Sequence, residues 1–318
     1  MMSVRMSLRH GALLLALLSL AGCLSITRKQ RGIHLSNAVL KEASLEQLVQ
    51  AMNTNALALQ SFNAKIDMDY SVGGKKKGKI TKYKEISGTM LLRKPGGLRV
   101  IGLVPVVHNR MFDMVSDGQT FQISIPGQNR FLMGTNQISV PSENPLENLR
   151  PQHIFDALPL RAVDPQNEIA VLESGTEIVK DPKTHQDAEQ PDYAVIVVRK
   201  EGDSWRLSRK IVVSRVDLLP YRLLIYNRLG DVETDVHYGE YMNYSGIQFP
   251  TLIEIQRPIE EVGIVLNVAK MNMNETLRNE QFQLVQPPGV TLINLDEKNK
   301  STTAVRGSDL TGKPSPAH

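Results

Sequence analysis

The sequence predicts an α+β protein that is mainly antiparallel β-sheet, in a single-sheet or barrel-like arrangement. From residue 62 onward, candidate strands follow one another with turn residues between them. Helical spacing of apolar residues is confined to short stretches within 44–59 and 144–160. The regular alternation of strands and helices that builds a parallel doubly wound sheet is therefore missing.

The N-terminus has the features of a bacterial lipoprotein signal. Arg5 and Arg9 precede an apolar run over 11–21, which is shorter than the about 20 residues needed to cross a bilayer. The run ends in Leu20-Ala21-Gly22-Cys23, a lipobox-like tetrapeptide, and Cys23 is the only cysteine of the chain. We predict cleavage before Cys23 and its acylation, which would hold the protein at a membrane. The alternative is an ordinary secretory signal or a buried cysteine.

The residue after Cys23 indicates in which bacterial membrane the lipoprotein would be anchored. Leu24 stands where an inner-membrane retention signal of enteric bacteria would carry aspartate. We therefore expect the outer membrane, with the protein facing the periplasm. A single cysteine also leaves no disulfide within the chain.

Composition favours a globular protein and gives no sign of nucleic-acid binding. The 318 residues are 41% hydrophobic, enough for one large core. The formal charge of +4 falls to +2 when Arg5 and Arg9 leave with the signal, because 35 basic residues then face 33 acidic ones. Such a balance does not predict a nucleic-acid partner.

The first predicted element of the mature chain is a helix over 44–59. Ser44 is placed to cap it, and Gln47 is the matching partner of a capping box. Apolar residues recur at helical spacing at Leu45, Leu48, Val49, Met52, Ala56 and Leu59. This helix should bury one apolar stripe.

Strands, a short helical region and further strands follow in that order. The first strands are predicted at 62–72, 80–92, 98–107, 111–116 and 120–125. Helical signals return over 144–160, where Pro145 suits a first helical position and Pro151 marks a break. Residues of this region expected to face the sheet are Leu146, Leu149, Ile154, Phe155 and Leu158. Later strands are predicted at 168–179, 193–200, 205–213, 221–227, 234–242, 252–256 and 262–273.

Several of the later strands are apolar on both faces. The run 193–198 is apolar throughout, and 211–213 and 223–225 are largely so. In an antiparallel sheet, such runs indicate cover on both sides or one face that lines a cavity. A core packed beneath the helices would explain most of these positions and need not leave a pocket.

The motifs of common enzymes and metal sites are missing from the sequence. There is no Gly-x-Ser-x-Gly elbow, no His-Glu-x-x-His and no phosphate-binding glycine loop. The histidines at 34, 108, 153, 185 and 237 lack the spacing of metal ligands, so we expect neither a metal nor another cofactor. The sequence predicts a protein that is not an enzyme.

The order of motifs resembles the LolA/LolB superfamily of lipoprotein carriers and receptors. The resemblance covers about residues 44–295 and rests on short tracts in a fixed order. These are the lipobox, the helix ending in Leu-Gln-Ser-Phe, GTMLLRKPGGLR at 88–99, DGQTF at 117–121, IPGQNR at 125–130, LPYR at 219–222, YGEY at 238–241, GIQFP at 246–250 and FQLVQPPG at 282–289.

The resemblance implies an unclosed, half β-barrel with a lid of short helices over an apolar cavity that holds acyl chains. The lipid anchor makes the chain look more like a LolB-type receptor than a soluble LolA-type carrier, although Trp205 is its only tryptophan. The expected organisation is a signal over 1–22, a tether over 23–43, the half-barrel domain over 44–298 and a disordered tail over 299–318.

Two sets of residues are candidates for lipid contact. Leu45, Leu48, Val49, Met52, Leu146, Leu149, Phe155 and Leu158 are candidates for lid and cavity contacts, or else simply pack in the core. Val104, Pro105, Val106 and Val107 are similar to the loop that inserts into the membrane in LolB-like receptors. An ordinary strand with a kink at Pro105 is the alternative.

The function expected from this resemblance is binding of the acyl chains of lipoproteins or lipids during lipoprotein sorting. The expected partners are the membrane through Cys23, acylated cargo, and a soluble periplasmic carrier. An RseB-like sensor or scaffold that binds lipid without transferring it is the competing hypothesis, because a sensor needs only different affinities in two states. A structural lipoprotein with a filled core is a third.

Overall fold

The structure, a computed structural model, describes residues 34–35, 39–74, 78–136, 149–180 and 187–297. The chain divides into two units, one of residues 1–37 and 178–189 and the other of residues 38–177 and 190–318. In the smaller unit, β1 (His34–Leu35) pairs in parallel with Ala188 and Glu189. Lys180 also forms an ion pair there with Asp187, 2.5 Å from Nζ to Oδ1.

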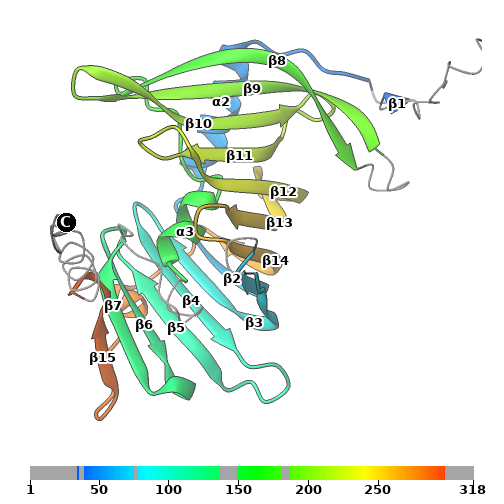
Figure 1. The fold of residues 1–318 in the computed structure, drawn as a ribbon. Coiled ribbons are helices and arrows are strands. Elements are labelled where there is room, and N and C mark those ends of the chain that lie inside the picture. The colour runs from blue at the N-terminus through cyan, green and yellow to red at the C-terminus, as the bar shows by residue number, and fades with distance from the viewer. Residues whose placement is uncertain (1–33, 36–38, 75–77, 137–148, 181–186, 298–318) are drawn as a thin grey trace, which may run out of the picture. The chain divides into compact units, whose positions relative to one another are not determined.

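The larger unit is built on one long sheet (Figure 1). Its strands run in the order β9-β10-β11-β12-β13-β14-β2-β3-β4-β5-β6-β7-β15, and β8 pairs with β9. Their bounds are β2 (Ser61–Val72), β3 (Thr81–Arg93), β4 (Gly97–Leu103), β5 (Arg110–Ser116), β6 (Thr120–Ile125), β7 (Arg130–Thr135), β8 (Glu168–Lys180), β9 (Asp187–Glu201), β10 (Ser204–Ser214), β11 (Pro220–Tyr226), β12 (Val232–Tyr244), β13 (Ile247–Arg257), β14 (Val262–Met273) and β15 (Thr291–Asn294).

The predicted class, mainly antiparallel β with few helices, is confirmed. Neighbouring strands from β9 through β7 pair antiparallel, and β15 joins β7 in parallel. Within the described residues, the two ends of this strand order do not pair, so the sheet is unclosed.

Several strand predictions need correction. The sequence patterns missed β7 and β15, which are short. The predicted strand 98–107 ends at Leu103, because residues 104–109 form a loop. β9 begins before residue 193, at Asp187.

Alternation along the strands builds the core. In β2, Phe62, Ala64, Ile66, Met68 and Tyr70 are all buried at every second position. The ring of Phe62 meets that of Phe249 from β13 edge to face, with centroids 5.8 Å apart. One face of the sheet is therefore packed along its central strands.

Two helices lie against this face. The helix predicted at 44–59 is α2 (Leu45–Ala58), and Pro151 opens α3 (Pro151–Ala157). Two short 3-10 turns, η2 (Pro126–Gln128) and η4 (Asn279–Phe282), also occur, and residues 295–297 are helical as well. The helical start predicted at Asn144 lies outside those residues.

Contacts of α3 show that the sheet is curved. Four strands separate β12 from β4 in the sheet order. At about 4.8 Å per step, a flat sheet would hold them roughly 24 Å apart, whereas a helix is only about 10–12 Å wide. Because α3 contacts β4, β5 and β12, these strands must curve around it.

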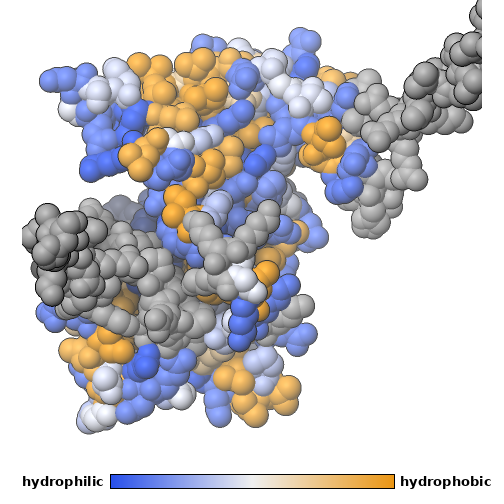
Figure 2. All heavy atoms as spheres, viewed as in Figure 1, coloured by the Kyte–Doolittle hydropathy of each residue, from blue (hydrophilic) through white to orange (hydrophobic). Residues whose placement is uncertain are grey.

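The other face of β8 to β10 also carries apolar side chains. Ile169, Val171 and Trp205 are 47%, 52% and 47% exposed. Hydrophobic side chains gather over β8 to β11 on the face drawn in Figure 2. In the runs that the sequence indicated as apolar on both faces, by contrast, successive residues such as Ala194 and Val195, or Ile211 and Val212, are all buried, so both faces are covered there.

Candidate functional site

The helix α2 begins where the sequence places it. The Ser44 hydroxyl accepts a hydrogen bond from the Gln47 backbone at 3.3 Å, and the Gln47 side chain accepts one from the Ser44 backbone at 2.9 Å. This capping box satisfies two backbone donors that the first turn leaves free. The apolar stripe of α2 then faces the sheet, with Leu48 and Ala56 buried.

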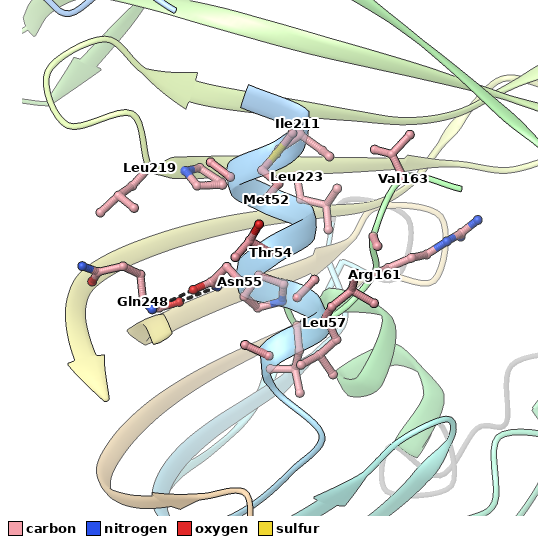
Figure 3. A pocket seen from close by; sticks show the side chains of 18 of the residues that line it. Met52, Thr54, Asn55, Leu57, Arg161, Val163, Ile211, Leu219, Leu223 and Gln248 are labelled. Carbon is pink, nitrogen blue, oxygen red and sulfur yellow. Dashed lines mark hydrogen bonds between the residues drawn. The ribbon is translucent and has the colours of Figure 1, made fainter. Parts of the chain in front are cut away.

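Two asparagines fasten α2 on its opposite flanks. Asn53 donates to the Val163 carbonyl at 3.1 Å and accepts from the Val163 backbone N–H at 2.8 Å. Asn55 makes the same pair of bonds to Gln248 of β13, at 2.8 and 2.7 Å (Figure 3). Each side-chain amide thus pairs with the backbone N–H and carbonyl of one residue, as a neighbouring strand would. The two pairs attach α2 to Val163 on one flank and to Gln248 on the other.

The C-terminal end of α2 is also held. Lys94, from the turn after β3, donates to the carbonyl of Ala56, and Asn274 donates to that of Ala58 at 2.9 Å. Burial lowers the pKa of Lys94. Cations and amide donors at this end satisfy carbonyls that the helix itself cannot pair.

A cavity of about 990 Å³ lies along α2. Figure 3 shows Leu219 and Gln248 on one flank of the helix and Val163 and Arg161 on the other. The strands contribute apolar side chains to its wall, chiefly Ile211, Leu218, Leu219, Leu223 and Ile225. Its volume is at the upper end of the about 300–1,000 Å³ typical of ligand pockets.

Two tyrosines of β12, whose hydroxyls are uncharged, also form part of the cavity wall. Tyr238 donates to the Ala157 carbonyl at 2.6 Å, and Tyr241 donates to the Pro220 carbonyl at 2.7 Å. Burial raises the pKa of both hydroxyls, for Tyr238 well above its ordinary value. This part of the cavity is therefore uncharged at physiological pH.

The lining of the cavity also includes ionisable side chains, namely Lys94, Asp156 and two arginines. Arg161 and Arg209 line it, and both bind the carboxylate of Glu168, whose side chain is fully buried. Burial lowers the pKa of Arg209 to about 10, and the neighbouring charge of Arg161 adds to this effect. The sequence analysis missed this cluster, because its members are far apart in the chain and no motif joins them.

The eight predicted lid and cavity residues fall into three groups. Met52, Phe155 and Leu158 line the cavity. Leu45, Leu48, Val49 and Leu149 belong to or pack against the hydrophobic core and do not line it. Leu146 lies outside the described residues, as does the predicted acylation site Cys23.

The segment 104–107 is a loop between β4 and β5. The Val104 N–H donates to the Asn109 carbonyl at 2.8 Å, and the His108 N–H donates to the Val104 carbonyl at 3.0 Å, which closes the loop at its base. Val106 and Val107 at its tip are 90% and 60% exposed. The segment is therefore not the kinked strand that was the alternative.

Two residues of the cavity wall that were not predicted as site residues lie in sequence runs that had indicated a possible cavity. Ile211 and Leu223 fall in the runs that are apolar on both faces, for which a cavity was one of two explanations. The sequence could not choose between a cavity and a filled core, because both require the same apolar side chains.

Comparison with known proteins finds similarity in structure alone. Neither a protein-family model nor a curated protein matches the chain. An outer membrane lipoprotein-sorting protein domain from Vibrio parahaemolyticus has a TM-score of 0.43 at 11% identity, covering 74% of this chain and 94% of that one. A DUF1329 family protein from Desulfovibrio piger has a TM-score of 0.46 at 15% identity, covering 74% and 97%.

A LolA superfamily protein from Nitrosomonas europaea is similar with a TM-score of 0.43 at 13% identity, covering 74% of this chain and 97% of that one. A LolA superfamily protein, from the class that the sequence motifs resemble, is thus among the solved structures to which the chain is similar. These likenesses concern the fold. The function proposed below rests on the cavity and its surroundings.

Replacing Asn53 by alanine is expected to lower the free energy of unfolding by about 1–3 kcal/mol, because the N–H and carbonyl of Val163 would lose their partner in a part-buried site. Urea unfolding measures this change. Gln60→Ala is the matched control, since its side chain is exposed and bonds only within its own turn. An equal loss in both variants would show that the Asn53 pair does not hold α2.

Proposed function

We propose that this protein is a lipid-anchored component of the bacterial envelope that binds acyl chains of lipoproteins or lipids in the cavity along α2 and takes part in lipoprotein sorting. The observation that carries the proposal is the cavity itself, with its aliphatic wall from β10 and β11 and its neutral tyrosines. Each methylene moved from water into such a wall contributes about 0.8 kcal/mol.

In this proposal α2, together with α3, is the lid. Met52 of α2 and Phe155 and Leu158 at α3 contact the chain in the cavity. The asparagine pairs hold α2 over the wall until cargo enters, and the loop 104–107 meets the membrane during delivery. Acylated Cys23 keeps the protein at the outer membrane, and a soluble periplasmic carrier supplies the cargo. None of the described helices is long and apolar enough to cross a membrane.

The first test is native mass spectrometry of the full chain carrying Cys23→Ser, purified without detergent and then denatured to identify co-purified lipid. Bound acylated species are expected. A clean apo mass that persists after addition of a lipopeptide would instead favour the structural protein with a filled core.

A second test fills the cavity from α2. Ala51 lines the cavity from an exposed position of the helix, so Ala51→Trp is expected to lower lipopeptide affinity at least about fivefold without loss of folding. Glu46→Trp adds the same ring to an exposed position of α2 outside the cavity and is expected to bind normally. Fluorescence titration with a labelled lipopeptide compares them, and equal affinities would reject the cavity as the binding site.

Transfer separates a carrier or receptor from the RseB-like sensor. Preloaded protein is mixed with liposomes, and the labelled lipopeptide that reaches the membrane fraction is measured over time. A receptor releases its cargo into the bilayer, whereas a sensor binds it and retains it.

A further inference from the structure

Three arginines surround the buried carboxylate of Glu168, and two of them, Arg161 and Arg209, line the cavity. Arg209 donates to Glu168 from both terminal guanidinium nitrogens, from Nη1 to Oε1 at 3.2 Å and from Nη2 to Oε2 at 2.9 Å. Arg199 lies with its Nε 3.3 Å from Oε1, and Arg161 donates to the same oxygen. One negative charge is thus shared by three positive ones.

Two neighbouring acids interact with the cluster through charge, Asp156 with Arg161 and Asp164 with Arg199, but no ion pair within 4 Å joins them among the described residues. Asp164 accepts from Asn167 at 2.8 Å and from the Gln166 backbone at 3.0 Å. Asp156 accepts from Gln152 at 2.7 Å. Within ion-pair distance the cluster therefore carries two positive charges in excess, which is costly next to an apolar cavity unless an anion compensates them.

Donors of the cluster remain free. The buried Nε of Arg209 has no hydrogen-bond partner in the described part of the chain. Arg161 uses Nη2 for its ion pair, and its side chain is 48% exposed, while that of Arg199 is 38% exposed. The guanidinium groups of Arg161 and Arg199 can therefore donate to an additional anion from the solvent side.

A β-bulge creates this arrangement. The register of β10 against β9 shifts between Leu207 and Arg209, so that Ser208 is the extra residue. Arg206 pairs with Arg199 and, after the shift, Arg209 pairs with Val197, which places Arg209 on the same face of the sheet as Arg199. Ser208 itself lines the cavity, beside Arg209.

We propose that Arg161, Arg199 and Arg209 bind the phosphate of an anionic membrane lipid whose acyl chains lie along Ile211 and Leu223 of the cavity wall. Guanidinium groups bind phosphate through paired, charge-assisted hydrogen bonds. Arg161 and Arg209 line the same cavity as the aliphatic side chains of β10 and β11, alongside Lys94 and Asp156, and this combination of cations and apolar wall fits a molecule with one charged end and an apolar body. This inference rests on the proposed function and adds a headgroup preference to it.

The test compares three probes with identical acyl chains, using the full Cys23→Ser chain. These are phosphatidylglycerol, phosphatidylcholine and the uncharged diacylglycerol, each offered in detergent micelles and measured by native mass spectrometry. We expect the wild-type protein to prefer phosphatidylglycerol over phosphatidylcholine about tenfold, a preference that weakens as salt rises. Inorganic phosphate is titrated separately.

Two variants and one control test whether these arginines cause the preference for phosphatidylglycerol. Arg161→Ala and Arg199→Ala each keep the pair between Arg209 and Glu168 and are expected to reduce the preference to about twofold. Arg228→Ala removes a cation that pairs with Glu201 and not with Glu168, and should keep the full preference. Urea unfolding checks that all three variants fold.

The outcomes separate the two proposals. Binding of diacylglycerol with no preference for phosphatidylglycerol would overturn the headgroup site and leave the proposed function standing. Failure of all three lipids to bind would overturn both. Inorganic phosphate bound as tightly as the lipid would assign the cluster to a free anion and overturn the lipid assignment.

Discussion

Glu168→Gln is expected to lower the free energy of unfolding by about 3–5 kcal/mol, the largest effect on stability that we predict. The glutamine keeps the size of the side chain but removes the charge that holds Arg209, whose side chain is only 4% exposed. Three arginines would then repel one another around a neutral amide. Urea unfolding followed by Trp205 fluorescence and by far-UV circular dichroism measures the loss.

Glu201→Gln is the matched control. Its carboxylate also binds two arginines, Arg206 and Arg228, each at 2.7 Å, but it is 39% exposed. Water solvates the arginines once the charge is gone, so we expect a loss below about 1 kcal/mol. Similar losses of unfolding free energy in the two variants would show that burial does not increase the contribution of Glu168 to stability.

Val106→Glu is expected to slow transfer of a labelled lipopeptide into liposomes at least about tenfold while leaving its binding unchanged. A charged residue placed in a bilayer costs about 2.5–3.5 kcal/mol on insertion scales, so a loop carrying it would not enter the membrane. Because Val106 is 90% exposed, the free energy of unfolding should change by less than about 0.5 kcal/mol.

The backbone of Val106 supports a role at the membrane. Its φ of 69° lies in the left-handed region, which disfavours a β-branched side chain. Such strain costs on the order of 1–3 kcal/mol and is common at functional sites. An exposed valine there gains nothing from packing in return.

Val285→Glu is the control for the loop. Val285 is 85% exposed in another part of the chain, so the substitution adds the same charge to an equally exposed valine. We expect normal transfer from this variant. Normal transfer from Val106→Glu as well would remove the loop from the mechanism, and unfolding of Val106→Glu would show that the segment has a structural role.

The sequence by itself determined the local elements. The capping box of Ser44 and Gln47, the stripe of α2 and the break at Pro151 were all readable, because they depend on residues within a few positions of one another. The alternation of β2 likewise follows from one strand alone. The lipobox at Cys23 is also a local pattern, and its acylation stays a prediction.

Only the tertiary structure decided what these elements enclose. The cavity depends on how the sheet curves and on which of two equally apolar faces is packed, so Met52 lines it while Leu48 is core. Glu168 meets Arg209 across 41 positions of sequence, and a one-residue bulge sets the face on which that arginine lies. Such pairings come from strand register and burial of charge, which periodicity along a chain does not encode.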